Sequence, residues 1–330
     1  MIEVQKIESF YEIEDAWKQL HRKNKELSYY QSFEYMQTVW NNIIPYLVIL
    51  KVRPVFYVFS KNNRVILILP LFKKILKRQY VLFGMKAGVG YLDAIYGNTI
   101  TDDEFKECFM TLGKTIPGSK IRFDYVRENT SLGKWLIKTG CALREEGCTE
   151  IPLPDNYEEY YASLSKHTRQ NIRTAYNRLR TDERKIEYKE YKYNEMSDEL
   201  YYTLQRMYIE RQSIKYKKGH LYKYYVRYVD VGTKIQRSDN IDERAFVVYI
   251  NGEVAAYCDA IYDDDTVMVP RLAIAEDFDR YSPGVILMNE SIKVLIEERI
   301  KRLDLTHGTE SYKVSLGGVV KNCIVAEIVV

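Results

Sequence analysis

The chain has 330 residues, which is too long for one ordinary hydrophobic core and fits two domains of typical size. Hydrophobic residues make up 46% and charged residues 29%, the balance of a soluble globular protein. The formal net charge of +3, from 49 Lys and Arg against 46 Asp and Glu, gives no ground to predict nucleic acid or an anionic membrane as a partner.

The first half of the chain mixes helical and strand patterns. Apolar residues at helical spacing predict helices at residues 9–23, 32–40 and 102–115. Strands are predicted at residues 46–52, 55–60, 65–72 and 120–125, with a turn at Lys61-Asn62-Asn63 between the second and third. The glycine-rich stretch 84–98 is predicted to be a loop, and it is a candidate wall of a ligand site.

Neither a membrane span nor a disulfide framework is predicted. The longest apolar runs, such as residues 65–72, are far shorter than the ~18–20 residues that a span needs. The first ten residues carry charges and lack a signal-peptide core, which predicts a cytoplasmic protein. The cysteines are odd in number and form no C-x-x-C pair, which argues against disulfides and a zinc site. Cys258 lies in an apolar strand pattern and is predicted to be buried and inert.

A boundary is predicted near residues 147–156, where Pro152 and Pro154 bracket a short extended stretch. It divides an N-terminal half, residues 1–150, from a C-terminal half, residues 151–330. Directly after it, Asp155 and Glu158 have the spacing of a capping box and predict the start of a helix.

Residues 165–180 have the pattern of a basic amphipathic helix. Ile172, Tyr176 and Leu179 define one apolar face, and arginines that include Arg169 and Arg173 occupy the rest. Between residues 165 and 193, nine Lys and Arg against four Asp and Glu leave a local charge of +5. Two interpretations remain open: a solvated helix face, or a helix that binds the phosphates of a ligand.

An antiparallel meander is predicted between residues 245 and 275. Residues 245–250 and 253–262 read as a hairpin, because Asn251-Gly252 is the pair best suited to a type I′ turn. The aspartates at 263–265 make the next turn, and residues 266–275 read as a third strand. Consecutive aspartates at a hairpin tip indicate a solvated turn rather than a calcium loop, so no metal is predicted.

The turn after this meander has the features of an anion site. Ser282 is a good N-cap residue, and Pro283 falls at the first helical position, where its missing N–H costs nothing. Gly284 has no side chain to block a ligand that approaches the backbone. The helix N–H groups at such a turn favour phosphate. The predicted helix ends near Arg299, and a strand follows at residues 303–306.

This order of elements resembles the core of the GNAT acyltransferases, and several phrases resemble their CelD/FemAB-like branch. The phrases are Ser165-Lys-x-x-Arg169-x-x-Ile-Arg173, Ser282-Pro-Gly284, and Leu303-Asp-Leu-x-x-Gly308-x-Glu310-x-Tyr312-Lys313. The Tyr30-Gln-Ser-Phe-Glu-Tyr35 phrase and Leu69-Pro-Leu71 also resemble the N-terminal region of the branch. The likeness covers nearly the whole chain, most strongly residues 157–318. It implies an α/β (α+β) fold of two GNAT-like halves, each a mixed, mainly antiparallel sheet flanked by helices.

The resemblance implies that the pyrophosphate of an acyl-coenzyme A, acetyl-CoA by default, lies on the turn. The residues concerned are Arg280, Ser282, Pro283, Gly284, Val285, Ile286 and Leu287. The usual GNAT turn reads Gln/Arg-x-x-Gly-x-Gly/Ala. Aligned on Gly284, this chain has Tyr281 first and the bulky Ile286 last, with Arg280 displaced by one position.

Amine attack on a thioester needs a neutral nucleophile, a stabilised oxyanion and a proton for the departing thiolate. In the resembled fold, backbone N–H groups along residues 269–274 would serve the oxyanion, and Tyr312 is the candidate proton donor. The general base is left open among Asp304, His307 and Glu310. Arg169, Arg173 and Lys313 are candidates to bind a phosphate or a carboxylate of either substrate.

Three functions are compatible with these patterns. The first is N-acyl transfer from acyl-CoA to an amino group, on a small molecule or, as the resemblance implies, a cell-envelope sugar or peptide precursor. The second is a FemAB-like transfer of an amino acid from aminoacyl-tRNA to a peptidoglycan precursor, in which the basic helix would contact tRNA phosphates. The third is a non-catalytic binding protein on a degenerate GNAT scaffold. The N-terminal half is predicted to shape the acceptor side, and no oligomeric state is predicted.

Overall fold

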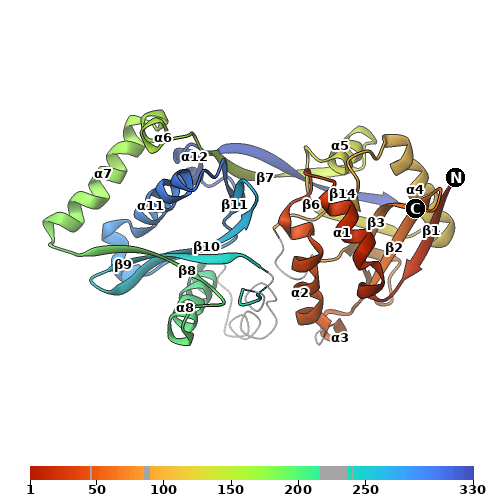
Figure 1. Cartoon of the computed structure of the whole chain (residues 1–330), viewed down its shortest axis with the longest axis horizontal. Helices are drawn as coiled ribbons and strands as arrows, with labels where there is room; N and C mark the ends of the chain where they lie inside the picture. Colours follow the sequence, from red (N-terminus) through yellow and green to blue (C-terminus); the bar gives the residue numbers. More distant parts are fainter. Residues whose placement is uncertain (45–46, 85–89, 216–235, 240) are drawn as a thin grey trace. The chain divides into compact units, whose positions relative to one another are not determined.

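The computed structural model describes the chain except for residues 45–46, 85–89, 216–235 and 240 (Figure 1). Its contacts divide the chain into two compact units. The first unit contains Met1–Glu146 and the C-terminal segment Asn322–Val330, and the second contains the described residues of Gly147–Val229 and Gln236–Lys321. No helix among the described residues is long and apolar enough to cross a membrane.

The first unit is a sheet with flanking helices. Its strands are β1 (Ile2–Ile7), β2 (Val52–Lys61), β3 (Arg64–Lys74), β4 (Gln79–Leu82), β5 (Ile95–Tyr96), β6 (Lys120–Arg127) and β14 (Val319–Val329). They follow the order β1-β2-β3-β4-β6-β14, with β5 beside β3, and only the β4–β6 pair is parallel. The helices are α1 (Glu14–Arg22), α2 (Phe33–Ile43), α3 (Leu47–Leu50), α4 (Asp102–Thr115) and α5 (Ser131–Lys138).

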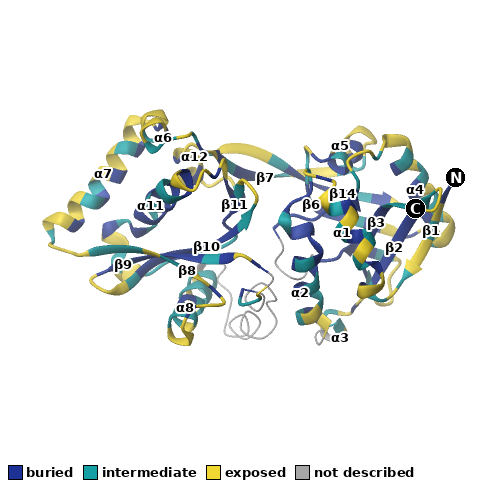
Figure 2. Cartoon of the chain, viewed as in Figure 1, coloured by how far each residue is buried: buried dark blue, intermediate teal, exposed yellow. Residues whose placement is uncertain are grey.

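The predicted elements of this unit are present with one clear error. Residues 46–52 were expected to form a strand, but Leu47–Leu50 is the short helix α3 and β2 begins only at Val52. An apolar run of this length has no period that distinguishes a helix from a strand. The predicted loop 84–98 contains the two-residue strand β5, and residues 85–89 lie outside the described residues. Figure 2 shows buried residues along the middles of β2 and β3.

The second unit has a six-strand sheet path. Its strands are β7 (Ala142–Pro152), β8 (Ile186–Lys192), β9 (Glu243–Ile250), β10 (Glu253–Asp263), β11 (Thr266–Met268), β12 (Leu272–Ile274) and β13 (Arg302–His307). The order is β7-β13-β11-β10-β9-β8, and β12 pairs with β10. The helices are α6 (Tyr157–Ser163), α7 (Lys166–Thr181), α8 (Asp198–Lys215), α11 (Pro283–Glu297) and α12 (Ser311–Ser315), with a 3-10 helix, η4 (Glu276–Tyr281), before α11.

Short sequence patterns predicted most of the local structure of this unit. Asn251 and Gly252 have φ of 51° and 83°, as the predicted type I′ turn requires. The capping-box prediction was wrong by one position, because Asn156 is the N-cap and its side chain accepts the N–H of Glu159. Cys258 is fully buried, and burial raises the pKa of its thiol.

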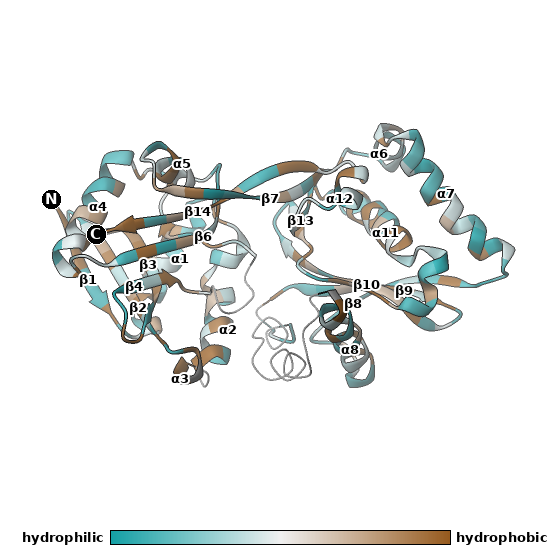
Figure 3. Ribbon diagram, turned by 180° about the vertical axis from the view of Figure 1, so that it is seen from behind, coloured by the Kyte–Doolittle hydropathy of each residue, from teal (hydrophilic) through white to brown (hydrophobic). Residues whose placement is uncertain are grey.

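The two faces of the sheet in the second unit carry different helices. Phe246, Val248 and Cys258 belong to a core cluster with residues of α7 and α11. The alternate residues Ala245 and Val247 belong to a separate cluster with residues of α8. Since successive side chains of a strand point to opposite faces, α8 and α11 cover opposite faces, as Figure 1 shows. Figure 3 shows that α7 is mainly hydrophilic along its length.

Candidate functional site

The site is at a gap where two strands of the second unit separate. The predicted third strand, residues 266–275, is broken into β11 and β12. β11 runs parallel to β13 as far as the pair Met268 and Asp304, and the N–H of Val269 still donates to the carbonyl of Asp304 at 2.7 Å. Beyond this point β12 pairs with β10 alone among the described strands, so its other edge is open.

A β-bulge in β13 accompanies the separation. Asp304 pairs with Glu150 and His307 with Cys148, so β13 has one residue more than β7 between these pairs. Thr306, within this bulge, has a φ of 54°, and its N–H donates to Oδ1 of Asp304 at 2.7 Å. Because a bulge bends and twists its strand, the direction of β13 changes at the point where its pairing with β11 ends.

The backbone of β12 offers polar groups to the gap. The carbonyl of Arg271 accepts the N–H of Asp259 at 2.9 Å, and the N–H of Ala275 donates to the carbonyl of Ala255 at 2.9 Å. In an antiparallel pair, alternate residues direct their N–H and C=O groups toward and away from the partner strand. The backbone groups of Leu272 and Ile274 therefore point into the gap.

The first turn of α11 lies beside β12 and has no side-chain cap. Ser282 occupies the N-cap position, as expected, but its φ of 52° is left-handed and its side chain makes no capping hydrogen bond. Its carbonyl accepts the N–H groups of Val285 and Ile286 at 3.0 and 3.4 Å, so the first turn is tightened. A Cβ on Gly284 would lie 2.7 Å from Cδ1 of Ile274, which indicates how closely the turn approaches the strand.

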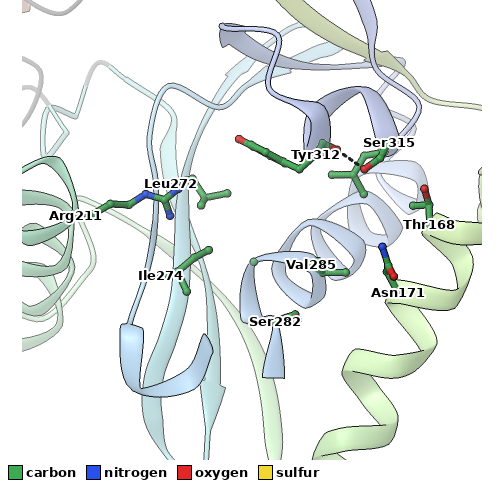
Figure 4. A pocket seen from close by; sticks show the side chains of 11 residues that line it. Thr168, Asn171, Arg211, Leu272, Ile274, Ser282, Val285, Tyr312 and Ser315 are labelled. Carbon is green, nitrogen blue, oxygen red and sulfur yellow. Dashed lines mark hydrogen bonds between the residues drawn. The ribbon is translucent and has the colours of Figure 1, made fainter. Parts of the chain in front are cut away.

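A pocket of about 310 Å³ connects these parts (Figure 4). Its lining is mainly apolar, with a few hydroxyl, amide and guanidinium groups, the usual composition of a small-molecule site. The lining residues are Thr168, Asn171, Arg211, Leu272, Ile274, Ser282, Gly284, Val285, Tyr312, Ser315 and Leu316. They include residues of both α8 and α11, so the pocket passes the open edge of β12 from one face of the sheet to the other.

Tyr312 is the one predicted catalytic residue that lines the pocket. It lies on α12, where Oγ of Ser315 donates to its backbone carbonyl at 2.8 Å, and Figure 4 shows its ring directed into the pocket. Burial, followed by the negative charge of Glu310, raises the pKa of Tyr312 to about 12, and the positive charge of Arg211 acts in the opposite direction. The phenol is therefore protonated near neutral pH and can donate a proton.

Lys313, a predicted phosphate or substrate residue, is directed away from the pocket. Its side chain is buried, and its ammonium donates to the carbonyl of Leu305 at 2.9 Å and to that of His307, with the carboxylate of Glu310 at 3.1 Å. An ammonium has three N–H donors, and these partners account for them. Lys313 thus fastens the end of β13 to α12, the helix that carries Tyr312.

The candidate bases do not line the pocket. Asp304 is 5% exposed and accepts the N–H of Thr306 at the bulge. His307 is at the end of β13, where its carbonyl accepts from Lys313, and Glu310 is the N-cap residue of α12. These three residues are near Tyr312 in the sequence, but none of them lines the pocket. The structure therefore does not identify any of them as the general base.

The other predicted ligand residues occupy different surroundings. Arg169 donates to the carbonyls of Ala162 and Leu164 at 2.8 and 2.6 Å, at the end of α6. Arg173 is exposed on α7. Arg280 pairs with Asp182 at 3.1 Å.

Three further residues of the predicted turn lie in α11. Pro283 is buried at the first helical position. Ile286 and Leu287 are also fully buried, in the core of the second unit. The bulk of Ile286 therefore points away from the ligand side of the turn, and these residues could meet a ligand only through their backbone.

Sequence reasoning missed part of the pocket. Thr168 and Asn171 are three residues apart on α7 and were detectable, because that spacing places both on one helix face within the basic phrase. Arg211 had no comparable signal. It lies on α8 (Asp198–Lys215), and no motif marks it in the sequence.

The sequence and the fold of the chain were compared with those of known proteins. Residues 166–314 match the model of an acetyltransferase (GNAT) domain. No curated protein has a matching sequence.

Among solved structures, that of FemX aligns with a TM-score of 0.61 at 10% identity, over 99% of this chain and 97% of that one. A tandem GNAT protein from the clavulanic acid biosynthesis pathway aligns with a TM-score of 0.54 at 11% identity, over 100% and 98% of the two chains. A conserved protein of unknown function from Bacteroides thetaiotaomicron VPI-5482 aligns with a TM-score of 0.57 at 12% identity, over the full length of both.

These identities are low, so the structural likenesses establish the fold alone. That fold is the predicted mixed α/β architecture with a mainly antiparallel sheet, shared over the whole chain with a tandem GNAT protein. The family match covers the pocket residues of α7, α8, β12, α11 and Tyr312. Residues 166–314, which hold Tyr312 and most of the pocket, match an acetyltransferase (GNAT) domain, and the whole chain shares its fold with a tandem GNAT protein and with FemX.

Proposed function

We propose that the second unit transfers an acyl group, acetyl by default, from acyl-CoA to an amino group. The observation that carries the proposal is the pocket, because it joins the uncapped start of α11, the open edge of β12 and the hydroxyl of Tyr312. Each of these parts matches one requirement of acyl transfer.

The donor would be held by backbone groups. The start of α11 offers the N–H of Gly284 and the positive end of the helix dipole, and both favour a pyrophosphate there, whereas the N–H groups of Val285 and Ile286 already donate to the carbonyl of Ser282. The outward N–H and C=O groups of Leu272 and Ile274 suit the amides of a pantetheine arm. An N–H at the same edge can stabilise the oxyanion that forms when the amine attacks the thioester carbon.

Tyr312 would complete the reaction. The amine nitrogen bonds to the carbonyl carbon, the C–S bond breaks, and the thiolate that leaves takes a proton from the phenol. The amine loses a proton to water or to a base that the pocket does not identify, and the phenolate of Tyr312 then takes a proton from water, which restores the phenol. A phenol with a pKa of about 12 is a competent donor for this step, because it remains protonated throughout the physiological range.

The aminoacyl-tRNA alternative has less support. Two arginines of α7 that would have met tRNA phosphates are bound to carbonyls instead: Arg169 to those of Ala162 and Leu164, and Arg178 to that of Arg280 at 2.8 Å. The other two arginines of that helix, Arg173 and Arg180, remain exposed. The acceptor on a cell-envelope precursor, the cytoplasmic location and the acceptor-side role of residues 1–150 all remain part of the proposal.

Calorimetric titration with acetyl-CoA and free coenzyme A tests the donor site. Wild type is expected to bind at micromolar concentration, and Gly284→Glu is expected to abolish binding, since its carboxylate would occupy the anion site. The new Cβ would meet only the end of the flexible Ile274 side chain, which can move aside, and a Glu in the first turn of a helix is favourable, so this variant should fold. Gly284→Gln is the matched neutral control and is expected to bind better than Gly284→Glu. If wild type fails to bind millimolar ligand, the acyl-CoA proposal is wrong, and transfer from aminoacyl-tRNA or a binding role should be tested next.

A further inference from the structure

Arg211 places a positive charge in a mainly apolar part of the pocket. Its side chain extends from α8 toward Leu272 (Figure 4). Both Arg211 and Tyr312 line this pocket, and the positive charge of Arg211 acts to lower the pKa of the Tyr312 phenol. Within the part of the chain that the structure describes, no hydrogen bond or ion pair joins Arg211 to another residue. A partly buried guanidinium in such surroundings is costly unless an anion meets it.

Arg271, an arginine of the same unit, differs from Arg211 because its charge is paired with buried acidic side chains. Its Nε lies 3.2 Å from Oδ2 of Asp259, and one of its terminal nitrogens is 4.0 Å from Glu243. Both carboxylates are buried, and Arg271 also lies over the ring of Tyr208 at 5.6 Å. The protein thus supplies the buried carboxylate of Asp259 to Arg271, whereas no carboxylate among the described residues pairs with Arg211.

The position of Arg211 indicates which substrate it would meet. It enters the pocket from α8, and α8 covers the face of the sheet opposite to α11. In the proposed function the pyrophosphate of the donor lies at the start of α11, on the other face. The group that meets Arg211 therefore belongs to the molecule that enters from the α8 side and reaches the thioester across the open edge of β12.

We propose that Arg211 determines acceptor specificity by binding an oxyanion, a carboxylate or a phosphate, on the amine-bearing substrate. This inference rests on the proposed function. Arginine suits the task because its planar guanidinium can donate two parallel hydrogen bonds to either group. The bound anion would hold the substrate so that its amine lies near Leu272 and Tyr312. An acceptor without an anion would leave the guanidinium desolvated and unpaired, and would be discriminated against.

The experiment compares four amines as acceptors, with acetyl-CoA as donor and release of free thiol as the signal. Glycylglycine carries a carboxylate that glycylglycinamide lacks, and glucosamine 6-phosphate carries a phosphate that glucosamine lacks. Wild type is expected to prefer one anionic amine over its neutral counterpart by about 10- to 100-fold in kcat/KM, the range for hydrogen bonds to a charged group. The pair that differs identifies the anion as carboxylate or phosphate.

Three variants assign the preference to Arg211. Arg211→Gln should remove it while acetyl-CoA binding, measured by calorimetry, stays unchanged, and Arg211→Lys should restore part of it. Arg206→Gln is the matched control, because Arg206 is an exposed arginine on the same helix and should leave the preference intact. Equal rates for both members of both pairs, or a preference that survives in Arg211→Gln, would overturn the inference.

Two further measurements separate the possible failures. If acetyl-CoA does not bind, the proposed function is wrong. If acetyl-CoA binds but none of the four amines is acetylated, the affinities of these amines for the CoA-saturated protein are compared in place of their rates. Equal affinities within both pairs then overturn the role of Arg211. If Arg211→Gln weakens coenzyme A but not dephospho-coenzyme A, the anion belongs to the donor and the inference is likewise wrong.

Discussion

Replacement of Lys313 by Met tests whether this residue serves the fold or a ligand. Lys313 is 5% exposed, and its ammonium donates to carbonyls at the end of β13, including that of Leu305 at 2.9 Å. Met has a similar length and fills the same space, so the substitution removes the charge and the donors with little change in packing. If the residue is structural, the variant should be less stable, with unaltered contacts at the start of α11.

The magnitude follows from the hydrogen bonds that are lost. A hydrogen bond to a charged group contributes about 1.5–3 kcal/mol, and two strong ones are removed, so the expected loss of stability is about 3–6 kcal/mol. The ion pair with Glu310 adds little, because that carboxylate is 43% exposed and regains water. At about 2–4 °C per kcal/mol, the melting transition of the second unit should fall by roughly 6–24 °C in calorimetry.

Lys166→Met is the matched control for this measurement. Lys166 is exposed at the start of α7, and its replacement should change stability by less than about 0.5 kcal/mol. If Lys313→Met is as stable as this control and loses affinity for acetyl-CoA, the structural role assigned to Lys313 is wrong. Lys313 would then bind a ligand, as its charge in the sequence suggests.

Three further predictions concern groups at or near the gap. Asp304→Asn should retain activity, since an amide oxygen can still accept the N–H of Thr306. Asp304→Ala should lower the free energy of unfolding, measured by urea denaturation, by about 1–3 kcal/mol. If Asp304→Asn folds but is inactive, Asp304 is instead a general base. Tyr312→Phe should lower kcat by about 10²- to 10⁴-fold without changing acetyl-CoA affinity. Ionisation of the Tyr312 phenol should not lower the wild-type rate until the pH approaches 12. An unchanged kcat in Tyr312→Phe would show that Tyr312 takes no part in the reaction. Burial and the charge of Asp259 raise the pKa of Glu243 from 4.5 to about 8, so the folded protein keeps a proton that the unfolded chain releases. Stability should therefore decrease as the pH rises from about 4.5 to about 8, and Glu243→Gln should flatten that slope in denaturation profiles.

Local chemistry determined much of the second unit. The Asn251-Gly252 turn is fixed by the ease with which both residues adopt positive φ, and the start of α11 is fixed by Pro283. The order of meander, turn, helix and strand could therefore be predicted from the sequence. So could the likeness of residues 166–314 to an acetyltransferase (GNAT) domain, because the phrases that carry it lie on contiguous elements. Tyr312 was reachable for the same reason, since it follows directly after β13.

Only the tertiary structure decided what the pocket contains. The gap beside β12 begins where β11 ends its pairing with β13, next to the bulge at Thr306, and neither feature is marked in the sequence by a hydrophobic period or a turn pair. Arg211 reaches the pocket from a helix on the opposite face, about 60 residues before β12 in the chain. Lys313 looked like a ligand residue because its charge is visible in the sequence, whereas the carbonyls that bind it are not. Side-chain partners of this kind depend on which distant segments pack together, and no local pattern specifies that.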